Sequence, residues 1–75
     1  MRSKPPLASG KEIVNAFLRI GYHKVSQKGS HIKIKNYETE IVLIIPNHKE
    51  VDRWTLKTIL KAAAISAEQF AKLLK

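Results

Sequence analysis

The fold is decided by the stretch from Tyr22 to Lys35, which reads YHKVSQKGSHIKIK. The glycine followed by a serine near its centre is typical of a tight turn. Polar and apolar side chains alternate on both sides of this turn, in residues 22–27 and 31–35, as they do in strands with one solvated face. The stretch therefore predicts a hairpin of two antiparallel strands. His31 stands where the turn becomes the second strand.

The second strand of this hairpin carries a titratable group on a positively charged face. Side chains two residues apart in a strand point to the same side, so we expect His31, Lys33 and Lys35 to project together. Ile32 and Ile34 point to the other side, and a further lysine, Lys28, stands three residues before the histidine. A histidine among lysines can move a proton beside a polyanion, so this face is the predicted functional surface.

A helix is predicted before the hairpin. Ser9 and Glu12 have the spacing of a Ser-x-x-Glu capping box, and Gly21 is a suitable left-handed stop. The apolar stripe of this helix is predicted to be Ile13, Val14, Phe17 and Leu18. Residues 1–8, which include two prolines, are expected to be a flexible lead-in, and residues 9–75 a single domain.

A third strand and two further helices are predicted after the hairpin. Residues 40–46 include five consecutive apolar side chains, which indicate either burial on both faces or an apolar patch left for a partner. Asp52 is a suitable N-cap for a helix from Arg53 to about Ala63, and Ser66 for a short last helix. The order α-β-β-β-α plus this last helix predicts an α+β fold. Its three-stranded antiparallel sheet has helices on one face and leaves the other open.

Two basic features lie near the start of the second helix. Arg53, Lys57 and Lys61 recur every four residues, and this stripe either contacts phosphate or an acidic partner, or is an ordinary solvated face. In the loop before the helix, His48 and Lys49 are either surface residues or phosphate contacts, with His48 then a candidate second acid/base group.

Composition restricts the classes of function. A chain of 75 residues has little room for a deep small-molecule site, and it contains no cysteine for a disulfide or thiolate site. We expect a cytoplasmic protein, because no apolar run is long enough for a membrane span and there is no secretory pattern. The net charge is +8, and residues 1–35, with eight Lys/Arg and one acid, account for +7 of it. Such segregated charge favours nucleic acid or an acidic partner.

Metal-free RNA cleavage is the chemistry that suits an isolated histidine on a basic face. The three histidines lack the spacing and carboxylate neighbours of a metal site, so neither a metal nor a cofactor is expected. RNA supplies its own nucleophile, the 2′-hydroxyl, and the protein need only move protons and stabilise the charged phosphate. Ser30 points away from His31 and is expected to bond within the turn or to contact phosphate. The alternative is that His31 only binds phosphate or fills the turn.

Six short segments stand in a characteristic order along the chain. They are Ser9-Gly10-Lys11-Glu12, Gly21-Tyr22, Gln27-Lys28-Gly29-Ser30-His31, Ile45-Pro46-Asn47-His48-Lys49-Glu50, Thr55-Leu56-Lys57-Thr58-Ile59-Leu60-Lys61 and Ile65-Ser66. In this order the chain resembles the HicA (YcfA-like) family, the mRNA interferase toxins of HicA–HicB toxin–antitoxin systems. The resemblance covers residues 7–74, and the segment ending in His31 is its most distinctive part.

The resemblance implies a fold like that of a double-stranded-RNA-binding domain, with His31 as the catalytic residue. It also implies an mRNA substrate and a cognate HicB-type antitoxin that covers the functional face. The residues predicted to bind RNA are Lys28, Gly29, Ser30, Lys33, Lys35, His48, Lys49, Arg53 and Lys57. The alternatives are a non-catalytic double-stranded-RNA-binding-like module and a basic protein-interaction domain.

Two residues depart from the family pattern, since glycine is expected at the positions of Trp54 and Ala64. Trp54 is interpreted as a core residue that pins the second helix to the sheet, because large aromatic side chains are usually buried. The alternative is a platform on which bases stack.

Overall fold

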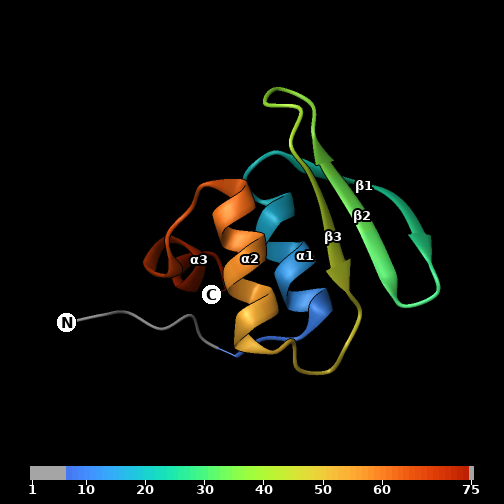
Figure 1. Cartoon of the computed structure of the whole chain (residues 1–75). Helices are drawn as coiled ribbons and strands as arrows, with labels where there is room; N and C mark the ends of the chain where they lie inside the picture. Colours follow the sequence, from blue (N-terminus) through green and yellow to red (C-terminus); the bar gives the residue numbers. More distant parts are fainter. Residues whose placement is uncertain (1–6, 75) are drawn as a thin grey trace.

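The computed structural model describes residues 7–74, which form a three-stranded sheet with three helices on one side, two of them against the sheet and the short last one packed on those two (Figure 1). The elements are α1 (Gly10–Leu18), β1 (Tyr22–Lys28), β2 (His31–Asn36), β3 (Val42–Pro46), α2 (Arg53–Ala63) and α3 (Ala67–Leu73). The strands are antiparallel and lie in the order β1-β2-β3. The predicted α+β architecture is confirmed.

Local signals in the sequence set the helix starts as expected. Ser9 and Glu12 close a reciprocal capping box at α1, and Ser66 and Gln69 close a second one at α3. Asp52 caps α2 by accepting a hydrogen bond from the backbone N–H of Thr55 at 3.0 Å. Each cap supplies an acceptor for N–H groups that the first helical turn leaves unpaired.

The core lies between the helices and the inner face of the sheet. Its largest fully buried side chains are Phe17, Phe70, Ile13, Ile34, Ile45, Leu56 and Val51. Phe17 of α1 contacts Tyr22 of β1 edge-on, with 5.1 Å between ring centroids, and Phe70 of α3 at 6.3 Å. The short last helix is therefore anchored by one fully buried ring.

Two predictions about the ends of elements are corrected. Leu18 was assigned to the buried stripe of α1 but is 42% exposed, because it is the last helical residue and lies at the edge of that stripe. The third strand begins at Val42, not at Glu40, because Glu40 has a φ of 62° and belongs to the preceding turn. Gly21 has the expected positive φ, of 100°, although α1 already ends at Leu18.

The third strand is buried on one face only. Leu43 and Ile45 are in the core, whereas Val42 and Ile44 are 43% and 49% exposed on the opposite face. Of the two readings of this apolar run, the structure therefore supports an apolar patch on the open side of the sheet. Within residues 7–74, no helix has the length and apolarity needed to cross a membrane.

The start of the fold includes the end of the expected lead-in. Residues 1–6 of that lead-in lie outside the described part of the chain. Ala8, however, is buried and forms an antiparallel bridge with Val51, whose N–H donates to the Ala8 carbonyl at 2.8 Å. Ala8 therefore belongs to the folded domain.

Candidate functional site: the open face of the sheet

A bulge in β1 determines which side chains lie on the open face, the side of the sheet away from the helices. The pairing with β2 shifts between Lys24 and Ser26, so that Val25 is an extra residue. One extra residue reverses the alternation of side chains beyond it. Lys28, which strict alternation from Tyr22 would point toward the helices, therefore pairs with His31 on the open face.

The open face carries three cross-strand rows. His31 lies between Lys28 and Pro46, Lys33 between Ser26 and Ile44, and Lys35 between His23 and Val42. The side chains of Lys28, His31 and Lys33 are exposed, and that of Lys35 is partly buried. The predicted grouping of His31, Lys33 and Lys35 on one side, with Ile32 and Ile34 buried on the other, is confirmed.

The turn next to His31 is held by side chains of β1. Gly29 has a φ of 59°, the left-handed conformation that glycine adopts at little cost. The Gln27 amide donates to the Gly29 carbonyl at 3.4 Å and accepts a hydrogen bond from Lys24 Nζ at 2.8 Å. Among the described residues, no side chain hydrogen bonds to the His31 ring, which leaves its two nitrogens open to a substrate.

At the far end of the open face, aromatic and basic groups meet. Lys35 Nζ lies 5.1 Å from the centre of the Tyr37 ring, and the His23 ring lies 5.7 Å from the same ring. A cation–π contact of this kind stabilises the position of a partly exposed lysine by a small amount. The Tyr37 ring therefore helps to position Lys35 at this end of the open face.

The loop between β3 and α2 is tied both to the turn and to α1. The Asn47 N–H donates to the Ser30 carbonyl at 2.6 Å, and the Gly10 N–H donates to the His48 carbonyl at 2.9 Å. Gly10 lies so close to this loop that a β-carbon would overlap the Pro46 carbonyl and lie 2.8 Å from Asn47 Cα. The loop that carries His48 and Lys49 is thus fixed beside the turn, with both side chains exposed.

The remaining predicted residues lie on a different surface. Arg53 and Lys57 belong to α2, which packs on the helix side of the sheet, whereas Lys28, His31, Lys33 and Lys35 lie on the open side. The start of α2 does lie at the same end of the molecule as the hairpin turn (Figure 1). The predicted set is therefore divided into an open-face group and an α2 group.

Trp54 is not a core residue. Its side chain is 78% exposed on the first turn of α2, so the prediction that it pins the helix to the sheet is wrong. The core stripe of α2 consists of Leu56, Ile59, Leu60 and Ala63. At about 100° per residue, Trp54 lies on the opposite side of the helix from this stripe.

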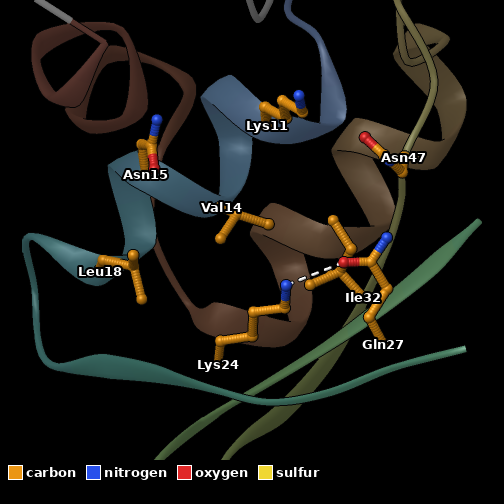
Figure 2. Close-up of a pocket in the computed structure, with 8 residues that line it drawn as sticks. All are labelled: Lys11, Val14, Asn15, Leu18, Lys24, Gln27, Ile32 and Asn47. Atoms are coloured by element: carbon orange, nitrogen blue, oxygen red, sulfur yellow. Dashed lines mark hydrogen bonds between the residues drawn. The ribbon is translucent and has the colours of Figure 1, made fainter.

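A groove of about 500 Å³ lies between α1 and the hairpin, on the helix side of the sheet (Figure 2). It is lined by Lys11, Val14, Asn15, Leu18, Lys24, Gln27, Ile32 and Asn47. None of the residues predicted to bind RNA lines it. The sequence signal for Lys11 and Asn15 was their spacing of four residues on one helix, and Lys24 shares the side of Tyr22 by simple alternation. The position of Gln27, in contrast, depends on the bulge.

No group of three or more potential metal ligands occurs within residues 7–74. Asp52, the acid closest in sequence to Trp54, is engaged in its cap: hydrogen bonds from the Thr55 hydroxyl and then from its backbone N–H lower the pKa of Asp52.

Comparison with known proteins identifies the family. A family model described as the HicA toxin of bacterial toxin–antitoxin matches residues 10–65, about three quarters of the chain. A search of curated proteins gives no match. The matched range contains both strands of the hairpin, the turn with His31, the loop and all of α2. The chain belongs to the HicA family of toxins from bacterial toxin–antitoxin systems.

Proposed function

We propose that this toxin is an mRNA endoribonuclease that works without a metal ion, with His31 as its catalytic residue. The observation that carries the proposal is the register of the hairpin. It places an exposed histidine directly opposite Lys28 and one row from Lys33 on the face that no helix covers. Membership of the HicA toxin family supports RNA as the substrate.

The reaction needs few groups, and the open face has them. His31 takes the proton of a ribose 2′-hydroxyl, whose oxygen attacks the adjacent phosphorus. The bond from phosphorus to the 5′-oxygen breaks, and that oxygen, as it leaves, receives the proton that His31 took up, so that His31 acts first as base and then as acid. The products are a 2′,3′-cyclic phosphate and a 5′-hydroxyl. Lys28 and Lys33 stabilise the additional negative charge on the phosphate as it develops.

The partner in the pair is a cognate antitoxin, as membership of the family implies. We propose that it covers the open face, where Val42 and Ile44 expose apolar surface beside the lysines of β2. Such a surface suits an acidic protein with apolar side chains at its centre. The toxin would act and be neutralised in the cytoplasm, where mRNA is found.

The test compares His31→Ala with His23→Ala, a matched control on the same face of the sheet. After circular dichroism confirms that both fold, growth arrest on induction and cleavage of RNA in vitro are measured. We expect His31→Ala to lose about 10²- to 10⁴-fold of the cleavage rate, the usual contribution of a general acid–base group, and His23→Ala to stay close to the wild type.

Two further measurements separate the proposal from its rivals. Cleavage should persist in excess chelator and should leave 5′-hydroxyl ends; a strict requirement for a divalent ion contradicts the mechanism. RNA that is shifted on a gel but never shortened favours a non-catalytic binding module. Equal growth arrest by the wild type and His31→Ala would remove the histidine from the catalytic role.

A further inference from the structure

Trp54 leaves an unusually large apolar surface in water. At 78% exposure it is more exposed than any other large apolar side chain in residues 7–74. Its ring makes no aromatic or cation–π contact with a described residue, and its backbone carbonyl accepts a hydrogen bond from the Thr58 hydroxyl at 3.1 Å. Large aromatic rings dominate the energetics of binding surfaces when they are covered, so this exposed ring, together with the charges around it, points to a ligand.

The helix that carries Trp54 is basic. Arg53 precedes it, and Lys57 and Lys61 follow it at three and seven residues, on the same side of α2. The helix contains no acidic residue between Arg53 and Ala63. The nearest preceding acid, Asp52, is hydrogen bonded to Thr55. The ligand that fits an exposed aromatic ring flanked by cations is a polyanion that carries flat aromatic groups.

We propose that Trp54 is a stacking site for an unpaired RNA base, with Arg53 and Lys57 contacting the phosphates on either side of it. Bases stack on aromatic side chains in single strands, where their faces are free, whereas in a duplex these faces are already occupied. A protein partner fits less well, because Trp54 is the one large apolar side chain that α2 exposes, whereas the centre of a protein interface combines several apolar side chains. The proposal deepens the function proposed above and rests on RNA being the ligand.

The position of Trp54 gives it a defined role in that function. The loop before α2 is hydrogen bonded to Ser30, the neighbour of His31, and the first turn of α2, which carries Trp54, directly follows this loop. Because α2 and His31 lie on opposite sides of the sheet, Trp54 holds a nucleotide that flanks the cleaved bond, not the one that reacts. It therefore strengthens binding of unpaired RNA around the cleavage site.

The chain contains a single tryptophan, so its intrinsic fluorescence reports on this site alone. The probe is a single-stranded 2′-O-methyl oligonucleotide, which lacks the nucleophile and cannot be cleaved. We expect its titration into the wild-type protein to quench the fluorescence. A duplex of the same sequence should quench much less. Unchanged fluorescence at an oligonucleotide concentration that saturates binding by gel shift overturns the proposal.

Variants test whether the ring itself matters. By gel shift, Trp54→Leu should bind the oligonucleotide about 5- to 150-fold more weakly, the range measured for loss of one stacked base, and Trp54→Phe should retain most of the affinity. An abasic strand of equal length should bind wild type and Trp54→Leu equally, because it offers phosphates without bases. Wild-type affinity in Trp54→Leu refutes the stacking site.

A charge variant separates stacking from electrostatic attraction. Lys57→Gln should reduce the slope of log K against log salt by about 0.7, the value for one phosphate contact on a single strand, and should leave the quenching at saturation intact. Trp54→Leu should leave the slope unchanged. A fluorescence response to an acidic protein but not to RNA would instead assign this surface to a protein partner.

The fluorescence test of the stacking site does not depend on whether the protein cleaves RNA. His31→Ala should lose cleavage while its Trp54 fluorescence still responds to RNA. If instead quenching is absent but the wild type cleaves RNA through His31, the stacking site fails and the proposed function stands.

Discussion

Replacing Gly10 by alanine should damage both the fold and the candidate site. At this position alanine is favoured by helix propensity, by about 0.5–1 kcal/mol over glycine. The new β-carbon, however, would overlap the carbonyl of Pro46 and lie 2.8 Å from Asn47 Cα. Both obstacles are backbone atoms, so no side-chain rotation relieves the overlap. Either α1 or the loop must move.

The size of the effect follows from what that movement breaks. Overpacking of this kind costs about 1–3 kcal/mol, and the hydrogen bond from the Gly10 N–H to the His48 carbonyl, net about 1 kcal/mol, is weakened with it. After the gain in helix propensity is subtracted, we expect a loss of about 2 kcal/mol in the free energy of unfolding. For a domain of this size the melting temperature should fall by about 8–16 °C.

Thermal and urea unfolding followed by circular dichroism measure this directly. The matched control is Lys11→Ala, one residue on and exposed, which should stay within about 0.5 kcal/mol of the wild type. Gly29→Ala is a useful contrast, because its φ of 59° is strained for alanine but nothing lies within 4 Å of the added carbon. A melting temperature for Gly10→Ala equal to or above that of the wild type would refute the steric argument. Because Asn47 bonds to Ser30, RNA cleavage by the folded fraction should also fall.

Three smaller changes test other parts of the structure. Ala64 ends α2 with a φ of 60°, so Ala64→Gly should remove left-handed strain and raise stability by about 1 kcal/mol, and an unchanged or lower melting temperature would contradict this. Asn36 accepts hydrogen bonds from two backbone N–H groups of the following turn, and Asn36→Ala should lower stability by about 1–2 kcal/mol in urea unfolding. The folded-state pKa of Asp52 lies below its ordinary value of 3.8 because of its bonds from Thr55. The stabilisation that the ionised Asp52 gives the folded state is therefore complete above pH 3.8 and is lost as the pH falls through the folded-state pKa. On acid titration the wild type should therefore lose more stability than Asp52→Asn, which can still cap the helix.

The sequence predicted the parts of the fold that local chemistry determines. Capping boxes, the Gly29-Ser30 turn and alternation in residues 31–35 are short-range signals, and the structure confirms each of them. The exposure of Trp54 was also within reach. The phase of the α2 core stripe places it outside, and this periodic evidence outweighs the general tendency of tryptophan to be buried.

The parts that the sequence could not supply depend on contacts between distant segments. Nothing in residues 22–28 indicates where the extra residue of the bulge lies, because it is defined only by pairing with β2. The closeness of Gly10 to Pro46 likewise requires the packing of α1 on the loop. The groove between α1 and the hairpin depends on both of these features, so the sequence did not predict its residues together.

The bulge in β1 also limits how the length of the hairpin can change in related proteins. A one-residue insertion or deletion between Tyr22 and Lys28 exchanges the two faces for every residue beyond it, and so moves Lys28 away from His31. An insertion or deletion of two residues leaves each later side chain on its original side of the sheet. Viable length variants of this strand should therefore differ by even numbers of residues, or else gain or lose a bulge that restores the parity. The extra residue Val25 therefore determines which side of the sheet carries Lys28.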